Sequence, residues 1–119
     1  MKVPGPDHPI TVTPNTKRVR VTIDGVVIAD TTHALTLKEA SYPAVQYVPR
    51  QDTNMELLRR TDRTTHCPYK GDAAYFSIVA NGKTLENSIW SYETPFPAMM
   101  EITGRLAFYP DKVKIEEVA

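Results

Sequence analysis

Runs of alternating polar and apolar residues dominate the chain. Residues 18–23 (RVRVTI) and 34–39 (ALTLKE) follow a two-residue period, which is typical of β-strands that bury one face. Between them, Asp24-Gly25 separates the first run from the apolar residues 26–29. Asp-Gly favours a tight hairpin turn because both residues tolerate a positive φ. The pattern therefore predicts a β-hairpin followed by a third strand.

The rest of the chain predicts further strands and one short helix. Residues 41–50 favour β structure but contain Pro43 and Pro49, and proline is tolerated mainly in edge strands. Asp52 precedes the apolar spacing of residues 55–60, which indicates a helix of about two turns with Asp52 as its N-cap. Further strands are expected at residues 73–78, 89–92, 105–109 and 113–116.

This order of elements predicts a mainly β protein. About seven or eight short strands with one short helix are typical of an antiparallel β-barrel or a folded sheet. We expect residues 1–119 to form a single domain, because this length suffices for one hydrophobic core. Residues 1–14 contain four of the ten prolines and are expected to form an extended arm.

Charge and composition narrow the classes of partner. The 14 Lys and Arg residues balance the 14 Asp and Glu residues, so the chain lacks the net positive charge that favours nucleic acid or anionic membranes. No apolar run reaches the length of a transmembrane helix, and the first residues lack the apolar core of a secretion signal. Cys67 is the only cysteine, which excludes an intramolecular disulfide. We therefore expect a cytoplasmic protein without nucleic-acid or membrane partners.

The stretch 64–71 carries the densest reactive chemistry. It holds Cys67, His66 and Lys70 and leads directly into the apolar strand predicted at 73–78. Cys67 could act as a nucleophile if a neighbouring cation, His66 or Lys70, stabilises its thiolate. It could equally line a pocket or pack as a small apolar residue. Lys70 could bind an anionic group or be a surface lysine at a turn.

Aromatic residues indicate a cleft for a planar ligand. Trp90 and Tyr92 are two residues apart on a predicted strand, so their side chains share one face, and Tyr47 could line the cleft with them. Arg50 could supply a forked contact to an anion at the rim. Glu39, at the end of a predicted strand, could act as a base or pair with an internal cation. The alternative for each is structural, as a core aromatic residue or a paired surface charge.

Six sequence blocks follow one another along nearly the whole chain, namely residues 5–10 (GPDHPI), 47–50 (YVPR), 65–71 (THCPYKG), 73–75 (AAY), 90–95 (WSYETP) and 104–109 (GRLAFY). Together they resemble the domain of unknown function 427, a bacterial and fungal family that is sometimes labelled a nucleotidyltransferase. The resemblance implies a small single-domain β-complex fold with one short helix. It is similar in outline to methionine-R-sulfoxide reductase B domains.

The residues do not favour two activities that this resemblance suggests. Nucleotide transfer normally needs a Gly-rich phosphate loop and closely spaced carboxylates for magnesium, and the sequence has no Gly-x-Gly, Gly-Ser, Asp-x-Asp or Asp-x-Glu. The reductase relatives often carry paired Cys-x-x-Cys zinc sites, which a single cysteine cannot form. Redox catalysis by Cys67 usually needs a resolving thiol, which only an external reductant could replace. We therefore expect no metal site and no cofactor.

The sequence thus leads to three functional hypotheses. The first is a binding domain for a small, partly planar, anionic ligand, with a cleft formed by Glu39, Tyr47, Arg50, Cys67, Lys70, Trp90 and Tyr92. The second is a small enzyme in which Cys67 acts with His66 or Lys70. The third is a homodimeric interaction module that uses the proline-rich arm or a strand edge.

Overall fold

The structure, a computed structural model, describes residues 1–118. Within this range the chain forms ten β-strands and three short 3-10 helices. The helices are η1 (Arg50–Asp52), η2 (Met55–Leu57) and η3 (Pro97–Ile102). The strands are β1 (Ile10–Asn15), β2 (Arg18–Ile23), β3 (Val26–Thr31), β4 (Ala34–Glu39), β5 (Val45–Tyr47), β6 (Leu58–Cys67), β7 (Gly71–Ala80), β8 (Lys83–Ser91), β9 (Ala107–Phe108) and β10 (Lys114–Val118).

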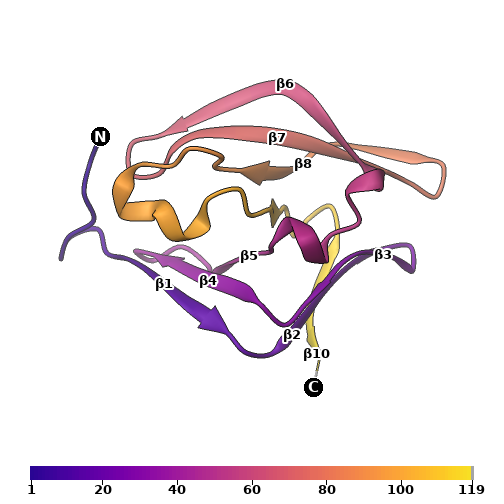
Figure 1. Ribbon diagram of the computed structural model, residues 1–119, viewed down its shortest axis with the longest axis horizontal. Helices are drawn as coiled ribbons and strands as arrows, with labels where there is room; N and C mark the ends of the chain where they lie inside the picture. The colour runs from indigo at the N-terminus through magenta and orange to yellow at the C-terminus, as the bar shows by residue number, and fades with distance from the viewer. Residues whose placement is uncertain (119) are drawn as a thin grey trace.

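The strands are arranged in three antiparallel sheets. Their orders are β1-β4-β5, β10-β2-β3 and β6-β7-β8-β9. Figure 1 shows the four-stranded sheet on one side of the molecule and the two three-stranded sheets on the other. Buried apolar residues from both sides, among them Ile28 of β3 and Ile78 of β7, form one core cluster between them. The mainly β, antiparallel class expected from the sequence is confirmed.

Within residues 1–118 the strands do not close into the expected barrel. β6 and β10 each keep one edge without a strand partner. Among the described residues, the only backbone pairing between the sheet β1-β4-β5 and the four-stranded sheet is an isolated bridge between Val48 and Leu106. The strands beside this bridge, β5 and β9, contain three and two residues, which is too short for a continuous ladder from one sheet into the next. Of the two predicted forms, the barrel and the folded sheet, the closed barrel is therefore not formed by this part of the chain, while the mainly β antiparallel class holds.

The helix expected after Asp52 is also absent from the described residues. The chain forms the 3-10 turns η1 and η2, and β6 begins at Leu58. Leu58 is buried and pairs with Ile78 of β7, so its apolar side chain belongs to a strand. The Asp52 carboxylate accepts a hydrogen bond from the Thr31 hydroxyl at 2.7 Å and makes no cap. Tertiary pairing has overridden the weak helical pattern.

Strand β7 is buried on both faces and separates two core clusters. Phe76 and Ile78 face the first cluster, whereas Ala73 and Tyr75 face the second. The second cluster is rich in tyrosine and lies among β4, β5, β7 and β8. It surrounds the candidate site described below.

The N-terminal residues lie against the rest of the protein. The Lys2 amide donates to the Pro68 carbonyl at 2.7 Å, and Gly5 and His8 pair with each other across a tight turn. Strand β1 then begins at Ile10, so the extended arm expected over residues 1–14 continues into the sheet as a paired strand. Among residues 1–118, no helix has the length and apolar character needed to cross a membrane.

Candidate functional site

A cavity of about 400 Å³ opens between β4, β5, β7 and β8. We call it the aromatic cavity, because one wall consists of the rings of Tyr47, Tyr75, Trp90, Tyr92 and Tyr109. Its polar end carries three reactive side chains, those of Glu39, Cys67 and Lys70. A mainly apolar wall with a few convergent polar groups is typical of small-molecule sites.

A buried ion pair forms the polar end. Lys70 Nζ lies 2.5 Å from Oε1 of Glu39, and their side chains are only 8% and 17% exposed. The other carboxylate oxygen of Glu39 lies 2.8 Å from Nε2 of His8. Lys70 Nζ also lies 3.7 Å from Cys67 Sγ. A connected row of side chains therefore runs from His8, outside the cavity lining, through Glu39 and Lys70 to Cys67.

Local sequence explains why these side chains meet. Glu39 is the last residue of β4, and Lys70 lies in the turn between β6 and β7. Gly71, which follows Lys70, has a φ of 109°, a conformation that other residues adopt only with strain. The glycine thus lets the chain turn sharply while the Lys70 side chain enters the cavity.

The ionisation of Glu39 follows from its partners. Burial raises the pKa of Glu39, but hydrogen bonds from Lys70 and His8 outweigh this effect and leave the pKa below the usual glutamate value. The carboxyl group is therefore negatively charged at neutral pH and balances the Lys70 ammonium.

The aromatic wall is fixed by contacts between rings. Trp90 Nε1 donates to the Tyr47 hydroxyl at 3.2 Å, and the two rings meet edge to face with centroids 6.5 Å apart. The Tyr109 ring also contacts Trp90, with a centroid separation of 4.6 Å and an interplanar angle of 51°. Such contacts add to the energy of burial, so the wall is rigid.

Two hydroxyl groups in the cavity have hydrogens without an acceptor. Burial raises the pKa of Tyr47 and of Tyr92 well above the usual tyrosine range, so both remain protonated donors. The Tyr47 oxygen accepts from Trp90, but its own hydrogen has no acceptor among residues 1–118. Tyr92 is only 7% exposed and its hydroxyl has no hydrogen-bond partner within the described range. Both residues line the cavity, so these hydroxyl hydrogens can donate to a ligand or to water that enters it.

The hydroxyl groups of Tyr75 and Tyr109, two further residues that line the cavity, form hydrogen bonds within the protein. Tyr75 Oη lies 3.0 Å from the Thr65 hydroxyl and 3.4 Å from Tyr109 Oη, and the Arg63 guanidinium lies over the Tyr75 ring. Burial raises the pKa of Tyr75, but these hydrogen bonds and Arg63 outweigh it and lower the pKa overall. Burial and the hydrogen bond to Tyr75 raise the pKa of Tyr109 to about 12. Because they bond to each other, these hydroxyls are less available to a ligand than that of Tyr92.

Most of the residues predicted for a ligand cleft line this cavity together. They are Glu39, Tyr47, Cys67, Lys70, Trp90 and Tyr92. Arg50 lies elsewhere: its guanidinium donates to the Gly104 carbonyl, the Ser91 hydroxyl and the Glu93 carboxylate. Ser91 lies between Trp90 and Tyr92 in the chain, so its side chain points to the opposite side of β8. Arg50 therefore does not border the aromatic cavity.

His66 also lies apart from the cavity. Its Nδ1 is 2.7 Å from the Asp72 carboxylate, and the side chains of His66 and Asp72 are 60% and 80% exposed. His66 and Cys67 are neighbours on β6, so they face opposite ways. Of the two proposed activators of Cys67, only Lys70 lies beside the sulfur.

Sequence reasoning did not assign Tyr75, Tyr109 or His8 to the site. Tyr75 and Tyr109 belong to strand patterns that a buried core also explains. His8 is isolated in the sequence, and its partner Glu39 is 31 residues away. The compact block GPDHPI around His8 was the only available signal.

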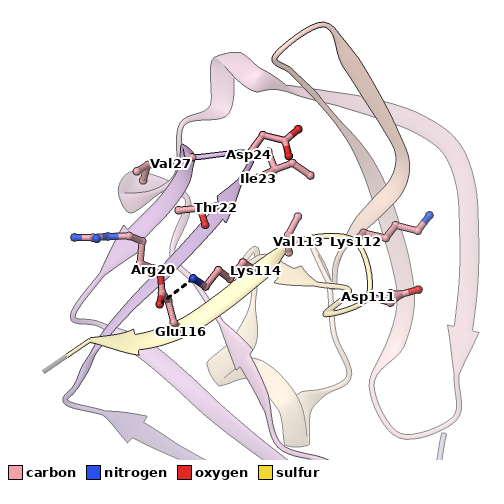
Figure 2. Close-up of a pocket in the computed structure, with 11 residues that line it drawn as sticks. Arg20, Thr22, Ile23, Asp24, Val27, Asp111, Lys112, Val113, Lys114 and Glu116 are labelled. Atoms are coloured by element: carbon pink, nitrogen blue, oxygen red, sulfur yellow. Dashed lines mark ion pairs between the residues drawn. The ribbon is translucent and has the colours of Figure 1, made fainter.

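A second, larger hollow of about 610 Å³ lies beside β2, β3 and β10 (Figure 2). It shares no lining residue with the aromatic cavity. Charges of both signs line it, and two of them form ion pairs: Lys114 with Glu116 at 3.7 Å, as the dashed line in Figure 2 marks, and Asp24 with Lys83 at 2.7 Å. The Nε of Arg20, which also lines this hollow, is buried without a hydrogen-bond partner among residues 1–118. The aromatic cavity is the stronger candidate, because a lysine, a glutamate and a cysteine converge there beside a wall of aromatic rings.

Comparisons with known proteins bear on the family rather than on the activity. A search of the curated proteins found no match. The family model described as "Domain of unknown function (DUF427)" matches residues 11–119. This range includes every residue named above that lines the aromatic cavity, whereas His8 lies before it. The match confirms the resemblance found in the sequence. The chain therefore belongs to the DUF427 family.

Proposed function

We propose that the aromatic cavity binds a small, partly planar, anionic molecule. The observation that carries the proposal is the Tyr92 hydroxyl, a donor without a hydrogen-bond partner among residues 1–118, in a cavity that also holds the Lys70 ammonium. Because Tyr92 lines the cavity and its hydroxyl donates to no protein group, the hydroxyl hydrogen is available to a molecule that enters. A ligand acceptor at this position would satisfy it.

The wall of the cavity favours a planar ligand. Trp90 contacts both Tyr47 and Tyr109, so little side-chain entropy is lost when a flat molecule binds against these rings. Their rings offer a large apolar area for such a molecule.

The polar end favours an acceptor group on the ligand. Both oxygens of Glu39 already bond to Lys70 and His8. Lys70 has three N–H donors, of which one points to Glu39 and another to Cys67. One Lys70 hydrogen and the hydroxyl hydrogens of Tyr47 and Tyr92 thus remain for an oxygen of the ligand.

A thermal-shift screen tests this function. The screen contains aromatic carboxylates, nucleotides, coenzymes and sugar phosphates. A ligand at about a hundredfold excess over its Kd stabilises the protein by about 2.7 kcal/mol, which raises the Tm by several degrees in a domain of this size.

A pair of variants locates the binding site. Val45→Phe narrows the aromatic cavity and should abolish the shift, whereas Val27→Phe, exposed on β3 outside the cavity, should preserve it. If no class of compound raises the Tm, or if the shift survives in Val45→Phe, the proposed function is wrong.

One observation favours a second function, an enzyme with Cys67 as its nucleophile. Cys67 lines the cavity and its sulfur lies 3.7 Å from the Lys70 ammonium. A cation at this position should favour attack by Cys67 on anionic reagents. Iodoacetate should therefore alkylate Cys67 faster, relative to iodoacetamide, than it alkylates glutathione. Lys70→Met should remove this preference, and a ratio equal to that of glutathione in the wild type would contradict the role of Lys70.

A further inference from the structure

We propose that the ligand of the aromatic cavity is an aromatic carboxylate and that its binding takes up one proton at His8. This inference rests on the proposed function and deepens it, because it names the chemical class of the ligand and the residue that balances its charge. His8 acts through Glu39 and does not border the cavity wall.

The polar end of the cavity carries no net charge. Lys70 and Glu39 form a buried pair whose charges cancel. A carboxylate that enters the cavity adds one negative charge that this pair does not compensate. An unpaired charge in a largely apolar site is strongly disfavoured, so binding requires one more positive charge nearby.

His8 is placed to supply that charge. Its Nε2 lies 2.8 Å from Oε2 of Glu39, and its ring stacks on Tyr69 with centroids 4.2 Å apart and an interplanar angle of 7°. Neutral His8 can donate from Nε2 to Glu39, and a second proton then binds at Nδ1 without breaking this hydrogen bond. The side chain is 27% exposed, so the proton can come from solvent.

The charged groups around His8 determine when it takes up the proton. The titratable and charged groups near it come from three segments. Glu39 ends β4, and Tyr69 and Lys70 lie in the turn after β6. Asp7 and Lys2 belong to the N-terminal residues, and Lys2 Nζ lies 5.9 Å from the centroid of the Tyr69 ring. Lys70 and His8 bond to the two oxygens of the same carboxylate, so the Lys70 ammonium repels a positive charge on His8 while Glu39 attracts it. A ligand carboxylate on Lys70 shifts this balance, and the protonated histidine becomes favourable.

The available donors favour a carboxylate over a phosphate. The hydrogens that lack acceptors belong to Lys70, Tyr47 and Tyr92, and two planar oxygens joined to an aromatic ring can meet them while the ring lies on the wall. A phosphate monoester carries up to two negative charges near pH 7, and one proton on His8 would leave one of them uncompensated.

Calorimetry with 2-naphthoate and its neutral counterpart 2-naphthamide tests the inference. Titrations at about pH 7 in phosphate and in Tris, which have different ionisation enthalpies, give the number of protons taken up. We expect uptake that approaches one proton for each naphthoate, and an affinity that falls by up to about tenfold for each pH unit once His8 is neutral in the free protein. Naphthamide should bind more weakly and without proton uptake.

Two histidine variants separate the role of His8 from other effects. In His8→Gln the side-chain amide can still donate to Glu39 but cannot take up a proton, so naphthoate should bind about tenfold more weakly and without proton uptake. His33→Gln, outside the aromatic cavity, should behave like the wild type.

Each contrary result has its own meaning. Naphthoate binding without proton uptake, or proton uptake that persists in His8→Gln, overturns the role of His8 and leaves the proposed function intact. Equal binding of naphthamide overturns the carboxylate class. Failure of both compounds to bind, while another class in the thermal-shift screen does bind, also overturns this inference and not the proposed function.

Discussion

The ammonium group of Lys70 lies 2.5 Å from a carboxylate oxygen of Glu39, although 31 residues separate the two in the chain. The pair connects the end of β4 to the turn between β6 and β7. Since both side chains are largely buried, each depends on the other for compensation of its charge. The pair therefore holds the turn between β6 and β7 beside the end of β4, at the polar end of the cavity.

Replacement of one residue of this pair should destabilise the protein more than replacement of both. We expect Lys70→Met to destabilise the protein by about 3 kcal/mol, at the lower end for a broken buried pair because His8 still bonds to Glu39. The double variant Lys70→Met/Glu39→Leu should recover part of this loss, since it leaves no buried charge. Urea unfolding of both variants measures the difference, and a double variant less stable than the single one would refute the argument.

Two tyrosines in the cavity should respond differently to removal of the hydroxyl group. Tyr47→Phe deletes the acceptor of the Trp90 indole hydrogen and should cost about 1 kcal/mol of stability. Tyr92→Phe deletes a hydroxyl without a protein partner and should change stability by less than about 0.5 kcal/mol. Tyr92→Phe should instead weaken any ligand found in the thermal-shift screen. Chemical denaturation gives the first comparison, and a Tyr92 variant as unstable as the Tyr47 variant would contradict it.

The fold could be predicted where local chemistry and long-range pairing agree. The hairpin of β2 and β3 is an example: Asp24 and Gly25 have φ values of 48° and 80°, as their turn sequence predicted. Strand β6 was not predicted, because its ten residues carry mainly polar side chains and many of them are exposed. An edge strand of this kind has no apolar alternation to reveal it. Only its pairing with the buried β7 defines it.

The sequence predicted the part of the candidate site that follows from the alternation of side chains along a single strand. Trp90 and Tyr92 lie on the same side of β8, as their spacing indicated, and both line the cavity. Arg50, predicted as a forked anion contact at the rim of the same cleft, does not line the cavity. The chain enters the 3-10 turn η1 at Arg50, which breaks the alternation and directs the guanidinium to Glu93. Sequence spacing carries no information across such a turn.

Substitution of Gly71 should disturb the turn that positions Lys70. Its φ of 109° lies in a region that residues with a Cβ adopt only with strain. A Cβ would meet the nearest backbone atoms at 3.6 Å, an ordinary contact, so the conformation and not a clash determines the cost. We expect Gly71→Ala to lower stability by about 1–3 kcal/mol.

The matched control for this variant is Gly5→Ala. Gly5 lacks a positive φ, and a Cβ there would meet only a side-chain oxygen at 3.7 Å. We expect a change of less than about 1 kcal/mol. Equal losses of stability in the two variants, measured by urea unfolding, would show that the conformation of Gly71 is not the cause.

Glu93 should contribute a stability that disappears in acid. The hydrogen bond from Arg60 is the main effect that lowers its pKa, with Arg50 acting in the same direction against burial, and together they lower the pKa to about 2. The unfolded chain binds the proton near the usual glutamate value of about 4.3. Since the folded pKa is the lower one, the stabilisation is complete above about pH 5 and is lost as the pH falls toward about 2.

Comparison of the wild type with Glu93→Gln isolates this contribution from the other carboxylates. The Glu93 side chain is 34% exposed, so solvent screens the pairs and we expect the difference to be about 1 kcal/mol. At pH 7 the wild type should be more stable than the variant by this amount, and the gap should close as the pH is lowered from about 5 to about 2. Urea midpoints across this range measure the gap. A gap that stays constant with pH would show that Glu93 stabilises the protein through packing and not through its charge.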